Sequence, residues 1–392
     1  MKRYIYLTFG ILTSCTIESN NSEDSKMLIE SSKQVAIGID SYTRLYCNCI
    51  RYYKEDSTEY ITLRRELPKE IYDEIIFFDL EQKLESYSVK VFREGPNAII
   101  GGLYGYDVIN KDSIVLSSKY MPILYLINSD GTITNQFVLD SIEGITESLM
   151  LSSNNLPFVK NHNIIDFPQN VPYTRIIHRP NPKDFKFSDC PLAYLINIET
   201  RDVIKSEASF PHLYDNNDRI YHSEGKSRAF DGENYVYSFH AYDSIIVTSN
   251  YIDTKNFVAK SRYMEAIENK GVPVGATNNE IMKGNLEAHY GNILYDKYRS
   301  VYYRFCYHED NYKGPQNIDY LMSGGAFSII IINEDFKVVG ETLFPSGKYA
   351  PRLFFVNKDG LWLSENNFQR EGVSDDILSF RCLTLEDISD EK

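Results

Sequence analysis

The chain has 392 residues, of which 43% are hydrophobic and 24% charged, a globular composition that excludes disordered and collagen-like proteins. Its formal net charge is −14, and such an acidic surface repels phosphate backbones, so we expect no nucleic acid partner. There are 31 Tyr and 21 Phe residues but a single Trp, and aromatic side chains suit the half-buried surface of strands. The composition therefore favours a β protein.

The first fifteen residues have the features of a bacterial lipoprotein signal peptide. Two basic residues precede the apolar run 4–12, which is too short to span a bilayer as a helix. The run ends in Leu12-Thr13-Ser14-Cys15, which resembles a lipobox, in which the cysteine becomes the lipidated first residue of the mature chain. The sequence therefore predicts a signal peptide over 1–15 and a lipid anchor on Cys15. The alternative is an ordinary signal peptide in which this cysteine is incidental.

The stretch after the signal peptide reads as a tether. Residues 16–34 open with a polar segment rich in Ser and Asn, which is typical of a flexible linker, and we expect the folded domain to occupy 35–392. No later segment approaches transmembrane length, so the lipid is the expected membrane contact. These features predict an outer-membrane lipoprotein of the cell envelope, facing either the periplasm or the cell surface.

A hairpin pattern recurs along the domain. In each case a continuously apolar run reaches a polar turn and a second run leads away, as expected for a strand buried on both faces and its partner. The Asp130-Gly131 pair lies at one turn and Asp359-Gly360 at another, and such pairs supply the positive φ of tight hairpins. The five hairpins of this type cover 75–89, 123–139, 192–208, 245–261 and 328–343.

Further strand pairs lie between these hairpins, at 106–116, 228–239, 293–305 and 353–364, with a last pair around 378–383. Four strands per unit and about six units predict an all-β, six-bladed propeller of four-stranded antiparallel blades. The N-terminal strands, near 37–53 and 60–64, are expected to close the ring beside the C-terminal ones. The alternatives are a β-sandwich or two stacked β domains. One helix is expected, over 261–269.

Three stretches resemble the Bacteroidetes lipoprotein family known as domain of unknown function 4221. They are the lipobox, the segment Phe92-Arg93-Glu94-Gly95-Pro96-Asn97 with the following Gly101-Gly102, and the segment 295–304. The resemblance covers nearly the whole mature chain. It implies a six-bladed propeller in the envelope but no established activity, so it provides no catalytic residues.

Motifs for known chemistry are missing from the sequence. There is no phosphate-binding or dinucleotide-binding glycine motif, no nucleophile elbow and no His-Glu-x-x-His zinc motif, so we expect no cofactor and no metal. The six cysteines are too few and too scattered for a disulfide framework. We interpret them as structural thiols, apart from Cys15; a metal or redox role for Cys47 and Cys49 is the alternative.

The densest polar and aromatic region runs from 287 to 304, and it contains four of the five candidate binding residues. Tyr and Arg are favoured at binding surfaces because they combine contact area with hydrogen bonding. Histidines from different blades can also converge at a propeller axis. The alternative is packing between blades with a structural ion pair from Arg304 to Asp296. The candidate binding residues are therefore His289, Tyr290, Tyr303, Arg304 and His240.

The sequence favours a binding or scaffold module over an enzyme, and three kinds of partner stay open: a peptide, a glycan or an envelope protein. The alternative function is an envelope hydrolase or lyase with its site at the propeller axis. A purely structural component of an outer-membrane complex is the third hypothesis. The fold does not decide among them, because propellers carry many unrelated functions.

Overall fold

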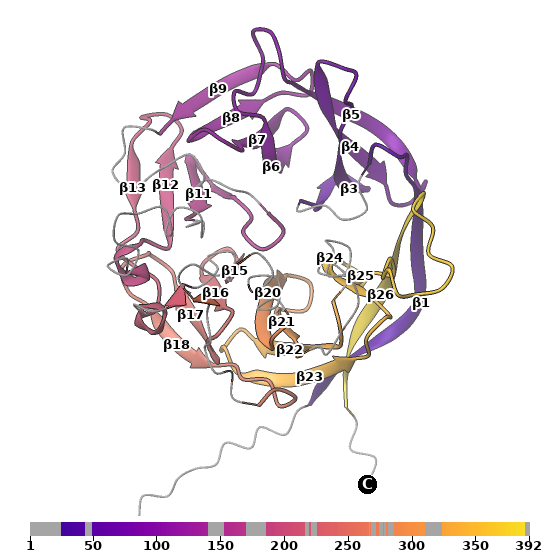
Figure 1. The fold of residues 1–392 in the computed structure, drawn as a ribbon, viewed down its shortest axis with the longest axis vertical. Coiled ribbons are helices and arrows are strands. Elements are labelled where there is room, and N and C mark those ends of the chain that lie inside the picture. The colour runs from indigo at the N-terminus through magenta and orange to yellow at the C-terminus, as the bar shows by residue number, and fades with distance from the viewer. Residues whose placement is uncertain are drawn as a thin grey trace, which may run out of the picture.

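The computed structural model describes residues 25–43, 49–139, 153–169, 186–215, 219–220, 226–265, 267, 272–273, 277, 280, 286–309 and 324–388. Six four-stranded antiparallel sheets stand in a ring around a central axis, which confirms the predicted six-bladed β-propeller (Figure 1). A separate pair of short strands, β14 (Arg219–Ile220) and β19 (Val272–Pro273), forms a two-stranded sheet.

The chain builds blades 1 to 5 from four consecutive strands, starting from the innermost strand, and completes blade 6 with the N-terminal strand. Blade 1 is β2 (Arg51–Glu55), β3 (Thr58–Arg65), β4 (Tyr72–Asp79) and β5 (Leu84–Phe92), and blade 2 is β6 (Leu103–Asn110), β7 (Ser113–Ser118), β8 (Ile123–Ile127) and β9 (Ile133–Val138). Blade 3 is β10 (Val159–Asn161), β11 (Ile164–Pro168), β12 (Ala193–Asn197) and β13 (Val203–Lys205). Blade 4 is β15 (Lys226–Phe230), β16 (Tyr235–Phe239), β17 (Ser244–Thr248) and β18 (Lys255–Val258). Blade 5 is β20 (His289–Asp296), β21 (Val301–Tyr307), β22 (Phe327–Asn333) and β23 (Val338–Phe344). Blade 6 is β24 (Ala350–Asn357), β25 (Gly360–Ser364), β26 (Ile377–Asp387) and β1 (Lys26–Gly38).

Antiparallel pairing gives the ring two distinct faces. We call the side at which the innermost strand of each blade begins the upper face, and the side at which it ends the lower face. The loops between blades and between second and third strands lie on the upper face, because every strand reverses direction. The tight hairpin turns lie on the lower face.

The five predicted hairpins form the outer halves of blades 1 to 5, and a shared turn explains their recurrence. In each, an Asp or Asn at the end of the third strand accepts hydrogen bonds from backbone amides two to four residues ahead, which holds the chain in an Asx turn. These residues are Asp79, Asn128, Asn197, Asn250 and Asn333.

The two turn glycines serve different purposes. Gly131 has a φ of +78°, as the hairpin prediction requires. The hairpin predicted at Asp359-Gly360 is present between β24 and β25, but Gly360 lies outside the positive-φ region, so only the predicted backbone conformation is wrong. A Cβ atom at Gly360 would collide with the carbonyl oxygen of Leu383 on the neighbouring strand, so this position needs glycine because two backbones approach closely.

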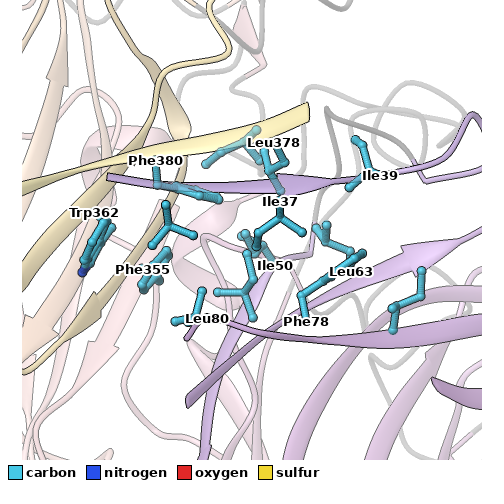
Figure 2. Packing of buried hydrophobic residues seen from close by; sticks show 14 of the residues in the cluster. Ile37, Ile39, Ile50, Leu63, Phe78, Leu80, Phe355, Trp362, Leu378 and Phe380 are labelled. Carbon is cyan, nitrogen blue, oxygen red and sulfur yellow. The ribbon is translucent and has the colours of Figure 1, made fainter. Parts of the chain in front are cut away.

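The N-terminal strand closes the ring, as predicted, although the details differ from the expectation. β1 is the outermost strand of blade 6 and pairs with β26 from Lys26 to Gly38, so residues 26–34 of the predicted tether belong to the sheet. The outer strand is half exposed and lacks a continuous apolar run, which hides it in the sequence. The other predicted N-terminal strands, β2 and β3, lie in blade 1 instead. Figure 2 shows the seam between blades 6 and 1, at which the ring closes and where Ile37 packs among apolar side chains of both blades.

The helix predicted over 261–269 is absent from its described residues, where 262–264 form bends. Side chains of blade 5 replace the helical bonding here. The Ser261 amide donates to Tyr290 Oη at 3.2 Å, and the Arg262 amide donates to Glu341 Oε2 at 2.8 Å. No helix of the part of the chain that the structure describes is long and apolar enough to cross a membrane.

Candidate functional site

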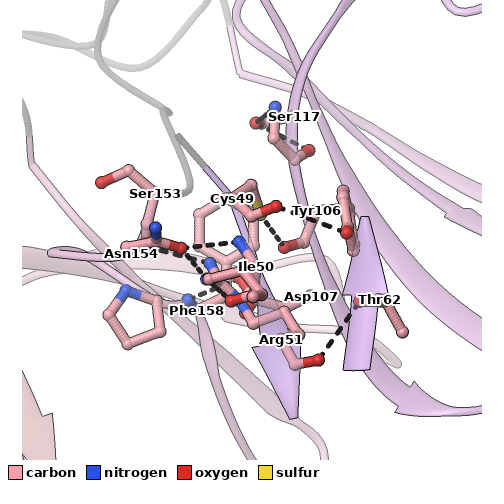
Figure 3. Close-up of polar contacts among 12 residues, drawn as sticks. Cys49, Ile50, Arg51, Thr62, Tyr106, Asp107, Ser117, Ser153, Asn154 and Phe158 are labelled. Carbon is pink, nitrogen blue, oxygen red and sulfur yellow. Dashed lines mark hydrogen bonds and ion pairs between the residues drawn. The ribbon is translucent and has the colours of Figure 1, made fainter. Parts of the chain in front are cut away.

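The segment Ser153-Asn154-Asn155, which we call the plug, lies in the connection between blades 2 and 3 and contacts the inner ends of blades 1, 4, 5 and 6, which places it at the axis. Figure 3 shows Ser153 and Asn154 beside Ile50 and Arg51. Asn154 Oδ1 accepts from the Ile50 amide at 2.7 Å and from Arg51 Nη1 at 3.2 Å, and its Nδ2 donates to the Arg352 carbonyl at 3.2 Å. The Asn154 side chain therefore links the neighbouring blades 1 and 6 at the upper end of the axis.

Asn155 completes the plug on the opposite side. Its carbonyl accepts from Ser227 Oγ and from the Arg228 amide, both at 2.9 Å, and its side-chain oxygen accepts from Asn292 Nδ2. These contacts tie the plug to blades 4 and 5. Because such a network satisfies its buried polar groups, it holds the plug in one position.

Two of the predicted binding residues, His289 and His240, meet at the upper face between blades 4 and 5. Their ring centroids are 4.7 Å apart, and the His289 ring packs 5.0 Å from that of Tyr307. His289 Nδ1 lies 2.7 Å from the Glu287 carbonyl, to which it can only donate. Burial lowers the pKa of His289 to about 4, and nearby Arg352 contributes in the same direction. The ring is therefore neutral at physiological pH.

Arg304 and Tyr290 form a stacked pair inside the same seam, with the guanidinium carbon 3.6 Å from the ring centroid. The arginine is fully buried and donates to Ser238 Oγ at 2.9 Å and to the carbonyls of Ala259 and Tyr242 at 2.8 and 2.6 Å. Burial lowers its pKa. These contacts join blade 5 to blade 4.

The structure places Tyr303 away from the other four predicted residues, because successive strand residues face opposite sides. Its hydroxyl donates to Asp296 Oδ2 at 3.1 Å near the lower face. Asp296 also pairs with Arg299 at 2.8 Å, so the alternative ion pair between Arg304 and Asp296 is wrong. A ligand contact for these residues stays a prediction, and Cys15 lies outside the described residues.

A pocket of about 490 Å³ opens on the upper face between blades 1 and 2. Its size is that of a small-ligand site. The lining combines charged side chains, tyrosines and two glycines: Cys49, Arg64, Glu66, Pro68, Asp73, Arg93, Gly101, Gly102, Leu103, Tyr104, Tyr106, Lys119 and Tyr120.

The carboxylate of Asp73, which is only 2% exposed, lies between two guanidinium groups at the pocket wall. Arg64 Nη2 donates to Asp73 Oδ2 at 2.7 Å, and Arg93 Nη1 lies 3.7 Å from the other carboxylate oxygen. Arg93 also donates to the carbonyls of Leu67, Glu70 and Tyr72, so both arginines are held in place. Fixed guanidinium groups of this kind suit anion recognition.

Glycine keeps the pocket open where the chain enters blade 2. Gly101 and Gly102 have φ values of +81° and +76°, and a Cβ atom at Gly101 would lie 2.6 Å from Ser118 Oγ. Arg93 and this glycine pair belong to the motif that carries the family resemblance, but sequence reasoning did not identify them as site residues. The signal was the motif itself, because glycines at positive φ often mark a close approach of backbone.

The other polar groups offer little metal chemistry. Among the described residues, no three His, Cys, Asp or Glu side chains are placed to hold a metal ion. Cys49, Cys190, Cys306 and Cys382 are buried and form no disulfide among the described residues, and burial raises the pKa of Cys49 to about 11. They pack as small apolar groups. Cys47 lies outside the described residues.

A family model, Domain of unknown function (DUF4221), matches residues 25–343. The chain belongs to the DUF4221 family. A crystal structure of a DUF4221 member from Bacteroides vulgatus is 26% identical, with a TM-score of 0.79, and the match covers 93% of this chain and 99% of that one. A Bacteroides fragilis protein whose name describes it as putatively exported is 9% identical, with a TM-score of 0.52 and coverage of 93% and 97%. No curated protein matches this DUF4221 chain.

Proposed function

We propose that the protein is a lipid-anchored binding module of the cell envelope, and that its ligand docks in the pocket between blades 1 and 2. The observation that carries the proposal is the pocket itself, which Arg93, Gly101 and Gly102 of the family motif help to build. The plug supports this site over one on the axis, because Asn154 and Asn155 occupy the position at which a hydrolase or lyase would hold its catalytic groups.

The strand order supports a defined orientation on the membrane. β1 begins at Lys26 on the lower face and runs 13 residues to the upper face, a length of about 40 Å. The ten residue steps from Cys15 to Ser25 span at most about 35 Å when fully extended, and about 18 Å as a flexible coil. A lipid on Cys15 therefore keeps the upper face, with its pocket, away from the bilayer.

Binding can be tested by probing an array of envelope glycans and peptides with the full lipoprotein in detergent. Lys119→Glu with Tyr120→Ala changes two exposed lining residues and should abolish the wild-type signal without unfolding the chain. Lys205→Glu, on the outer strand of blade 3, is the matched control and should retain it. Identical array profiles for the wild type and the pocket variant would overturn the proposal.

Anchoring and orientation can be tested in phosphatidylethanolamine vesicles that contain a headgroup quencher. The wild type should float with the vesicles and Cys15→Ser should not. A fluorophore at Asp335→Cys, in an exposed lower-face turn, should be quenched strongly, and one at Lys119→Cys on the upper face should be nearly unaffected. Flotation of Cys15→Ser would refute the anchor, whereas equal quenching at both positions would refute the orientation alone.

A further inference from the structure

We infer that the pocket between blades 1 and 2 binds a small ligand through a carboxylate group, with a flat face of the ligand against the rim tyrosine. This inference rests on the proposed function and names the chemistry of its site. Two sources share this chemistry: an acidic sugar and the carboxyl terminus of a short peptide.

The charge of the pocket is the first argument. Three basic side chains line it, Arg64, Arg93 and Lys119, against the two acidic ones, Glu66 and Asp73. The local excess is positive in a chain whose net charge is −14. A cleft whose lining carries a net positive charge attracts ligands of the opposite sign, so this lining favours anions over neutral ligands.

The second argument is that the structure already holds the cationic groups in place. Asp73 and the carbonyl of Leu103 fix the Arg64 guanidinium, and three carbonyls fix that of Arg93. A ligand then binds without the entropic cost of ordering two long side chains. The Arg64 Nε is buried and has no hydrogen-bond partner among the described residues, so the positive charge of this guanidinium is only partly compensated by hydrogen bonds within the wall.

The third argument is the composition of the rim. Tyr120 is 62% exposed, which is high for a large aromatic side chain, and the Lys119 ammonium lies 5.1 Å from its ring centroid. Ile100 and Met121 beside it are also exposed. An aromatic face next to a cation accommodates a ligand with one flat apolar side and one charged group.

The experiment compares two pairs of probes in which only one partner carries a carboxylate: galacturonate against galactose, and acetyl-dialanine against its amide. Titration calorimetry on the full lipoprotein in detergent gives each affinity. We expect at least one acid to bind at least on the order of tenfold more tightly than its neutral partner, the value of one charge-assisted hydrogen bond. Which acid binds tells the sugar source from the peptide source.

Charge variants then test the residues. Lys119→Gln should weaken binding of the acid by several-fold, whereas Glu66→Gln should strengthen it, because the Glu66 carboxylate lies 3.7 Å from Arg64. Lys205→Gln on blade 3 should change nothing. Equal affinity for acid and neutral probes, no binding of either acid, or insensitivity to both pocket variants would overturn the inference. A pocket that prefers other ligands on the array would leave the binding module intact.

Discussion

Two seams, each between a pair of neighbouring blades, end differently at the upper face. Between blades 4 and 5, the rings of His240, His289 and Tyr290 fill the space above the buried Arg304. Between blades 1 and 2, the chain enters its innermost strand through Gly101 and Gly102, and the space stays open as the pocket.

The difference teaches how a repeated blade makes a site. All six blades have the same strand order, so the ring alone provides six similar seams. Aromatic side chains at the start of β20 bury polar groups for stability, whereas glycines at the start of β6 leave arginines facing solvent. The proposed binding site therefore depends on the side chains that are missing from one seam as much as on those that are present.

The largest effect on stability is expected in the seam between blades 4 and 5, which we call the filled seam. Arg304→Met leaves Ser238 Oγ and the carbonyls of Ala259 and Tyr242 without their donor, which should cost about 3–5 kcal/mol of unfolding free energy. Tyr120→Ala in the seam between blades 1 and 2, which we call the open seam, should change the unfolding free energy by less than about 0.5 kcal/mol. Urea denaturation checks both, and similar losses would remove the distinction between the seams.

The filled seam should also respond to acid. An unfolded histidine has a pKa of about 6.5, whereas burial lowers that of His289 to about 4. As the pH falls from 6.5 to 4, the unfolded state takes up a proton that the folded ring resists, so stability should fall by about 3 kcal/mol from this group.

The measurement for His289 is the difference between wild type and His289→Asn in thermal unfolding at pH 7, 5.5 and 4. The variant keeps a donor toward the Glu287 carbonyl but has no titrating ring. Its stability should therefore decline less over this range. Parallel pH profiles would mean that the buried histidine does not set the acid response.

The plug should contribute an intermediate effect. Asn154→Ala removes the acceptor of the Ile50 amide and the donor to the Arg352 carbonyl, at a cost of about 2 kcal/mol. Hydrogen exchange should speed up at the Ile50 amide and stay unchanged at the Arg228 amide, whose partner is the backbone of Asn155. Unchanged exchange at Ile50 would show that the plug holds without this side chain.

The smallest effect separates the two glycines of the open seam. Both have positive φ, so alanine at either position is strained by about 1 kcal/mol. Only at Gly101 does the added methyl group also meet Ser118 Oγ, whereas nothing lies within 4 Å of one at Gly102. Thermal unfolding should therefore show a larger loss of stability for Gly101→Ala than for Gly102→Ala. Equal losses would mean that Ser118 moves away from the added methyl group without cost.

The sequence predicted the ring but not the site. The third strands of the blades, such as β8 and β22, can be recognised in the sequence because they are buried on both faces and are therefore continuously apolar. The start of β1 was hidden because an outer strand is half exposed. The pocket could not be predicted, because Arg64, Arg93 and Lys119 converge only through the packing of two blades.

The position of β1 also decides how the domain carries mechanical load. Tension on the proposed membrane tether would enter at Ser25, whose amide donates to the Val339 carbonyl at 3.0 Å, and would then run along β1. The ten residue pairs between β1 and β26 are loaded in parallel as the strand is pulled lengthwise, so they resist by shear instead of opening one after another. The strand that closes the ring would thus also bear the pull of the proposed anchor.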